Sequence, residues 1–70
     1  MLEVVHNSVH KLRKNAKVTQ EELATAVGVT RQTIIAIEKG SYSPSVALAL
    51  KIAHYFDQSV ESIFTLEKHE

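Results

Sequence analysis

The chain contains no cysteine and no tryptophan, and its 70 residues include only two glycines and one proline. The lack of cysteine excludes disulfides and thiolate metal sites. A domain of this length buries only about 60% of the surface that its extended chain exposes, so its core is small and oligomerisation is the expected source of further stability. We find no repeats and no linker, and we expect a single domain over residues 1–70.

Long hydrophobic runs are also lacking. No stretch approaches the roughly 20 apolar residues of a membrane-spanning helix. The start of the chain has neither the basic region nor the apolar region of a secretory signal. We therefore expect a cytoplasmic protein.

The formal net charge is zero, so the total charge does not suggest a polyanionic partner. The charges are unevenly distributed, however, because residues 1–56 carry seven Lys or Arg against four Asp or Glu, and residues 57–70 carry one against four. This polarity favours a nucleic acid beside the basic part of the chain and a different contact at the acidic end. A charge-balanced, solvated surface is the alternative interpretation.

Hydrophobic periodicity predicts a first amphipathic helix that ends near Asn15. Its apolar positions are Val5, Val9, Leu12 and Ala16, and its other faces carry Lys11, Arg13, Lys14 and Lys17. A second, short helix follows, because Thr19 and Glu22 form a T-x-x-E capping box and Gly28 permits a sharp turn after it. Thr30 then caps a third helix, which Gly40 ends.

The rest of the chain predicts two further helices. Pro44 prevents the third helix from continuing, Ser45 caps a fourth that runs to about Phe56, and Ser59 caps a last short helix through Ile63. The fourth helix is apolar over more than one face, so we expect it to be central or shared with a partner. One stripe is Val46, Ala49, Leu50, Ala53 and Phe56, and the adjacent face is Leu48, Ile52 and Tyr55.

The two ends of the chain, Met1-Leu2-Glu3-Val4 and Phe64-Thr65-Leu66-Glu67, are too short and too alternating for helix. They either pair as a small two-stranded sheet or fray. The expected fold class is therefore an all-α, compact five-helix domain, with the pairing of its ends left open.

A capped short helix, a glycine turn and a second capped helix fit a helix-turn-helix, here over about residues 19–40, which lays its second helix in the major groove of DNA. Residues 8–64 resemble the Xre or Cro/phage-repressor family. The similar segments are Thr19-Gln20-Glu21-Glu22-Leu23-Ala24, Gly28-Val29-Thr30-Arg31-Gln32-Thr33-Ile34, Ile37-Glu38-Lys39-Gly40, Tyr42, Pro44-Ser45 and Leu50-Lys51-Ile52-Ala53. The resemblance implies a prokaryotic or phage transcription regulator that is dimeric on a near-palindromic operator.

Side chains that can read bases follow from the orientation of the third helix, whose apolar face must point inward while its first turn enters the groove. They are Arg31, Gln32, Thr33 and Ala36. Gln32 is the first choice, because Gln can bind adenine at N6 and N7. Arg31 reaches either guanine or only a phosphate. Ile35 either contacts a thymine methyl or is an isolated exposed apolar residue.

Residues that flank the groove are candidates for phosphate contacts, which set the register of a protein on DNA and not its sequence preference. They are Gln20, Lys39, Ser41, Tyr42 and Ser43. The start of the second helix also favours an anion through its backbone N–H groups. The resemblance supports Gln20 and Lys39, and it implies that Arg13 pairs with Glu38 and ties the first helix to the third.

A second copy of the chain is the expected protein partner. Apolar residues at about 52–67 exceed what a five-helix monomer needs, and we assign the dimer contact to Ile52, Tyr55, Ile63, Phe64 and Leu66. Two recognition helices would then enter successive major grooves about 34 Å apart on a short inverted repeat, with repression as the expected outcome.

Other functions have weaker support. His6 and His10, at i and i+4 on the first predicted helix, could share a metal, but exposed histidines explain them better and we expect no cofactor. The motifs of common enzyme sites are missing, so we expect no catalysis. The remaining alternative is a protein-interaction module, such as an antitoxin with autoregulatory DNA binding. Only Thr65 to Glu70 follow the last predicted helix, too few for a toxin-binding arm, so we favour the DNA-binding regulator.

Overall fold

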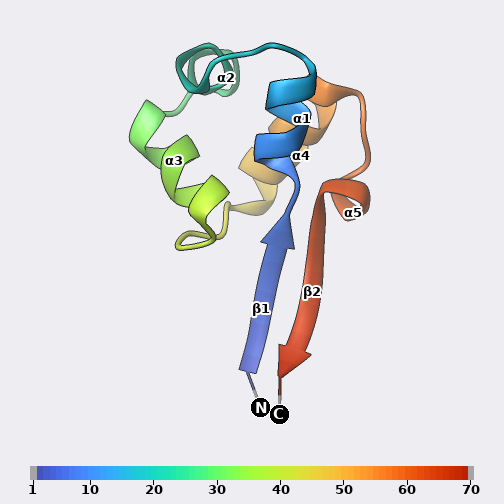
Figure 1. Cartoon of the computed structure of the whole chain (residues 1–70). Helices are drawn as coiled ribbons and strands as arrows, with labels where there is room; N and C mark the ends of the chain where they lie inside the picture. Colours follow the sequence, from blue (N-terminus) through green and yellow to red (C-terminus); the bar gives the residue numbers. More distant parts are fainter. Residues whose placement is uncertain (1, 70) are drawn as a thin grey trace.

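A computed structural model describes the backbone of residues 2–69 and the side chains of residues 5–66. Over these residues the elements are β1 (Leu2–Asn7), α1 (Val9–Asn15), α2 (Gln20–Val27), α3 (Arg31–Lys39), α4 (Val46–Phe56), α5 (Val60–Ile63) and β2 (Phe64–His69). Figure 1 shows the helices gathered into one body, from which the first and last strands extend as an antiparallel two-stranded ribbon (the hairpin), whose strands are joined through the helical body and not by a tight turn. The expected five-helix fold is confirmed, with the two ends paired.

Local hydrogen bonds set the helix boundaries where the sequence predicts them. A side-chain oxygen accepts a hydrogen bond from the backbone N–H three residues later at four N-caps: Thr19, Thr30, Ser45 and Ser59. Glu22 completes the reciprocal capping box of α2. Gly28 and Gly40 end α2 and α3 with φ of 77° and 80°, a backbone conformation that side chains disfavour.

The core lies between the helices, and every helix contributes to it. The largest fully buried side chains are Leu23, Ile34, Ile37, Ile52, Ile63 and Val9. Helices of only 4 to 11 residues are marginal on their own. Burial of each such side chain, at about 1.5–3 kcal/mol, is what stabilises them together. No helix within residues 2–69 has the length and apolarity to cross a membrane.

The hairpin is longer than the sequence suggested. β1 pairs antiparallel with β2 from Leu2 opposite His69 to Asn7 opposite Phe64. Val5 therefore lies in β1, and its assignment to the first helix is wrong. The helix starts at Val9 instead, because the side-chain oxygen of Asn7 accepts a hydrogen bond from the N–H of Val9 at 3.1 Å. Met1 lies outside the described residues.

The apolar faces of α4 divide differently from the prediction. Leu48, Ala49, Ile52 and Ala53 are buried, whereas Val46 is 78% exposed and Leu50 44% exposed, so the core face takes residues from both predicted stripes. Because successive residues of a helix turn by about 100°, Val46 and Leu50 lie on one flank of the buried face. Tyr55, which is 40% exposed, lies on the opposite flank.

Two residues assigned to the dimer contact are core residues. Ile52 is 0% exposed and Ile63 is 2% exposed, so neither can reach a second chain while the monomer keeps its fold. That part of the prediction is wrong, because the small core of this chain uses both side chains itself. Tyr55 and Leu66 are exposed and Phe64 is half-buried, and for these three the prediction stands untested.

Candidate nucleic-acid interface

The second and third helices and the turn between them form a helix-turn-helix. In the turn, the N–H of Val29 donates to the carbonyl of Ala24 at 2.9 Å, and the Val29 side chain packs against the core. Ile34 and Ile37 bury the inner face of α3. The outer face of α3 is thereby left to solvent on a rigid support.

The first turn of α3 presents two exposed polar side chains, Arg31 and Gln32. Thr33 and Ala36 are half-buried, and so is Ile35. The hydroxyl of Thr33 lies 3.1 Å from that of Thr30, and either oxygen can be the donor, so its methyl group is the part that a ligand can contact without competing for this hydrogen bond. Gln32 and Ala36, at i and i+4, therefore share the outer face of α3, with Arg31 and Thr33 on its two edges.

A buried ion pair ties α1 to α3. Nε of Arg13 donates to Oε2 of Glu38 at 2.8 Å and Nη2 donates to Oε1 at 3.3 Å, while Nη1 donates to the carbonyl of Val18 at 2.9 Å. The Arg13 and Glu38 side chains are only 10% and 7% exposed. The pairing implied by the family resemblance is confirmed.

The charge of Glu38 is held in place by this network. Burial by itself would raise the pKa of Glu38, but hydrogen bonds from Arg13 and Gln20 and the positive charge of Arg13 outweigh burial and lower the pKa. The carboxylate is therefore ionised at neutral pH and has partners that neutralise it. It does not present an unpaired negative charge beside the outer face of α3.

Two predicted phosphate-contacting residues are already hydrogen-bonded within the protein. Nε2 of Gln20 donates one hydrogen to Glu38 at 3.1 Å, and its second hydrogen remains available. The hydroxyl of Ser41 donates to the carbonyl of Ala36 at 3.2 Å, so a phosphate would compete for that hydrogen. The other three, Lys39, Tyr42 and Ser43, are exposed at and after the end of α3.

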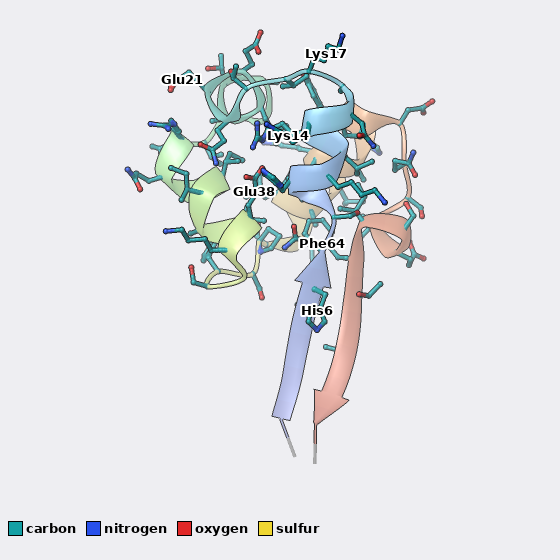
Figure 2. The ribbon with its side chains drawn as sticks, in the orientation of Figure 1. His6, Lys14, Lys17, Glu21, Glu38 and Phe64 are labelled. Atoms are coloured by element: carbon teal, nitrogen blue, oxygen red, sulfur yellow. The ribbon has the colours of Figure 1, made fainter. Side chains whose placement is uncertain are left out.

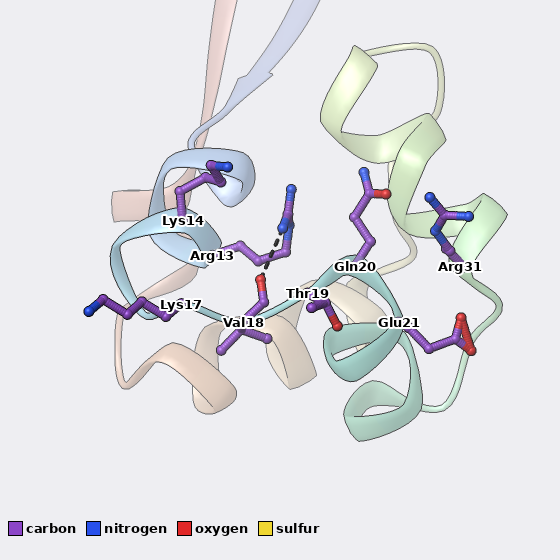
Figure 3. A pocket seen from close by; sticks show the side chains of 8 residues that line it. All are labelled: Arg13, Lys14, Lys17, Val18, Thr19, Gln20, Glu21 and Arg31. Carbon is purple, nitrogen blue, oxygen red and sulfur yellow. Dashed lines mark hydrogen bonds between the residues drawn. The ribbon is translucent and has the colours of Figure 1, made fainter.

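A basic groove of about 570 Å³ opens between the end of α1 and the starts of α2 and α3. Figure 3 shows Lys14 and Lys17 on one side of it and Arg31 on the other, with Gln20 between them. Its lining residues are Arg13, Lys14, Lys17, Val18, Thr19, Gln20, Glu21 and Arg31. Cationic side chains outnumber the single acidic one, and the first backbone N–H groups of α2 lie beside them, so the groove favours an anion.

Lys14 and Lys17 line this groove, and sequence reasoning did not include them among the candidate site residues. The sequence predicts them only for the polar faces of the first helix, whereas Figure 2 shows Lys14 near the end of α1 and Lys17 just after it, beside the start of α2. Lys17 adopts φ 59°, a left-handed backbone conformation. This conformation costs a residue that has a side chain about 1–2 kcal/mol. The signal in the sequence is the pair of lysines three residues apart, immediately before the capping box.

The histidines do not form the arrangement considered for a metal. His6 lies in β1 and His10 in α1, so they are not at i and i+4 of one helix. That spacing argument is wrong, because the helix begins only at Val9.

An exposed polar turn on the second helix of a helix-turn-helix, beside a basic groove, defines a DNA-binding domain. A helix-turn-helix family model matches residues 9–63, and the chain belongs to this family. An HTH-type transcriptional regulator of Methanocaldococcus jannaschii is 52% identical over 64 residues, which cover 91% of this chain and 97% of that protein. The cryptic phage CTXphi transcriptional repressor RstR of Vibrio cholerae is 34% identical over 50 residues, which cover 71% of this chain and 45% of the repressor.

The whole chain, hairpin included, has a counterpart among solved structures. The transcriptional regulator VanUg superposes with a TM-score of 0.78, covering 99% of this chain and 92% of that one at 23% identity, which shows a shared fold. The family match and the relatives show that the protein is a transcriptional regulator with a helix-turn-helix DNA-binding domain of the Xre type expected from the sequence. The family is one of regulators and not of enzymes.

Proposed function

We propose that this chain is a repressor that binds a short inverted-repeat operator as a homodimer, with one α3 helix in each of two successive major grooves. The observation that carries the proposal is the exposed first turn of α3 lying beside the basic groove. In a helix-turn-helix this turn is the part that reaches base edges, while the flanking groups hold the phosphates.

Base reading is assigned to Gln32 first, through a bidentate contact with adenine, and then to the methyl groups of Thr33 and Ala36 against thymine. Arg31 lines the basic groove together with Lys14 and Lys17, which favours a phosphate contact over a guanine contact for this residue. Sequence preference would then depend chiefly on Gln32.

Phosphate contacts are assigned to groups on both sides of α3, so that the two backbones bordering one major groove are held at once. On the side of the basic groove these are Lys14, Lys17, Arg31 and Gln20, and on the other side they are Lys39, Tyr42 and Ser43. Ser41 is a weaker candidate, because its hydroxyl hydrogen is donated to the carbonyl of Ala36.

Repression is supported by the similarity to a phage transcriptional repressor. A dimer on an inverted repeat covers about one full turn of DNA between its two recognition helices, enough to compete with another protein for the same site.

The test is selection from a pool of randomised duplexes at two salt concentrations, followed by sequencing of the retained DNA. We expect an enriched inverted repeat whose half-sites are one helical turn apart, with affinity that falls as salt rises. The Gln32→Ala variant is the matched control, and it should lose the preference at one position of each half-site. Weak, salt-sensitive binding without enrichment would contradict the proposal and favour a protein-binding module.

A further inference from the structure

A second groove of about 380 Å³ lies where the hairpin leaves the helical body, and it is apolar. It is lined by Val5, Ser43, Pro44, Val46, Ala49, Leu50, Val60 and Phe64. None of these described residues is charged, in contrast to the basic groove. Val46, 78% exposed, and Leu50, 44% exposed, are on the flank of α4 that faces this groove.

The apolar surface continues from the groove onto one face of the hairpin. Residues directly opposite each other in an antiparallel pair point to the same face, and the register places Val5 opposite Leu66 and Asn7 opposite Phe64. Val5, Phe64 and Leu66 therefore share one face with the polar Asn7, and Leu66 is 60% exposed. Exposed apolar surface that extends over several elements of a small protein marks an interaction site.

We propose that this surface, the hairpin groove of Val5, Pro44, Val46, Leu50, Phe64 and Leu66, binds the same surface of a second copy of the chain. The inference rests on the homodimer proposed above and deepens it, because it locates the contact. Tyr55 is outside this contact, because it lies on the opposite flank of α4.

The absence of charge from the described lining of the hairpin groove fits a second copy better than another partner. A two-fold axis brings a patch against itself, so a charged patch would place like charges together. An uncharged apolar patch meets no such penalty. A charged peptide would find no opposite charge with which to pair in the lining.

A partner would also support the outer part of the hairpin. A two-stranded hairpin is marginally stable in water unless another surface packs against it. Figure 1 shows β1 and β2 continuing well beyond the helices, with the described part of the outer hairpin covered by none of them. A second chain seated on the hairpin groove would cover the face that carries Leu66.

This surface is also connected to the recognition helix. Pro44 belongs to the loop that directly follows α3, next to Ser43, which is one of the proposed phosphate contacts. Nδ2 of Asn7 donates to the carbonyl of Ile37 at 2.9 Å, which joins the base of the hairpin to the C-terminal half of α3. A dimer contact here would therefore fix how the two α3 helices are oriented, and so the spacing of the half-sites.

The test is sedimentation equilibrium of the full chain without DNA, comparing Val46→Glu with Tyr55→Glu. Both positions are exposed on α4, so the two variants add the same charge to opposite flanks of this helix. Circular dichroism checks that each variant is folded. Because like charges would meet at the two-fold axis, we expect Val46→Glu to raise the dimer dissociation constant at least about 100-fold, and Tyr55→Glu to change it by less than about threefold. Leu66→Glu, on the hairpin face, should act as Val46→Glu does.

The outcomes separate this inference from the function that it rests on. Wild-type protein that is monomeric both free and on a selected operator would overturn the homodimer itself. Wild-type dimers that Tyr55→Glu dissociates, while Val46→Glu and Leu66→Glu do not, would overturn only the location of the contact.

Discussion

The two grooves of this small protein are built in opposite ways. At the basic groove the polar groups are organised by hydrogen bonds, of which the contacts of Arg13 with Glu38 and Val18 are the most buried. At the hairpin groove no described lining residue is charged and large apolar side chains stay exposed. This difference indicates that the basic groove suits a polyanion, whose negative charge its cationic side chains can neutralise. The hairpin groove suits an apolar surface instead.

The largest effect should come from breaking the organisation behind the basic groove. Arg13→Ala leaves the Glu38 carboxylate buried without its partner, so we expect a loss of about 3 kcal/mol in the free energy of unfolding, measured by urea denaturation. Lys14→Ala, at the exposed neighbouring residue, is the control and should change it by less than about 0.5 kcal/mol. A loss below about 1 kcal/mol for Arg13→Ala would mean that the pair does not hold α1 against α3.

The next test separates sequence reading from charge on the DNA-facing side. Gln32→Ala should weaken binding to the operator by about 1–3 kcal/mol and relax the preference at one base pair, without a matching loss on random DNA. Lys39→Ala should weaken both kinds of DNA alike. Competition titrations with fluorescent duplexes measure both, and equal losses for Gln32→Ala on operator and random DNA would remove Gln32 from the base-reading set.

A third test uses Lys17, where one substitution should raise the stability of the protein and weaken its binding to DNA. Lys17→Gly should raise the free energy of unfolding by up to about 1 kcal/mol, because glycine accepts the left-handed backbone at this position. It should also reduce the slope of log affinity against log salt by about 1, through loss of one phosphate contact. Lys51→Gln is the control, because it removes the same charge from an exposed position of α4, and it should leave the slope unchanged. An unchanged slope for Lys17→Gly would exclude a contact between Lys17 and a phosphate.

The smallest expected effect is on acid stability. The pKa of Glu38 is lower in the folded protein than in the unfolded chain, so its contribution is fully present above the ordinary pKa of glutamate and is lost as the pH falls through the lower, folded value. Urea unfolding at stepwise lower pH should therefore show a steeper decline for the wild type than for Glu38→Gln. Glu22, whose pKa the Thr19 hydrogen bonds lower, remains in both proteins as an internal control. Parallel declines would contradict this role of Glu38.

Residues 19–40 could be predicted almost entirely from the sequence. The caps at Thr19 and Thr30 and the turns at Gly28 and Gly40 depend on hydrogen bonds and backbone angles within three or four residues, so the local sequence contains the whole cause. The Arg13–Glu38 pair links positions 25 residues apart, and only the resemblance to a known family anticipated it.

The start of the chain was predicted less well. Val5 precedes Val9 at a spacing that fits a helix, and nothing local to it reveals that residues 64–69 lie alongside. Strand pairing joins the two ends of the chain. Whether residues 2–7 form a strand or a helix therefore depends on a distant partner strand, which the periodicity of the local sequence does not reveal.

The sequence by itself therefore determined the helix-turn-helix, its caps and the face of α3 that looks outward, because these follow from short-range interactions. Only the tertiary structure decided which face of α4 is covered and that Ile52 and Ile63 belong to the core. It also decided that Lys14 and Lys17 line the same groove as Arg31, from the opposite side. The physical reason is that burial and electrostatic potential at a residue depend on every element packed around it. Those neighbours come from distant parts of the chain.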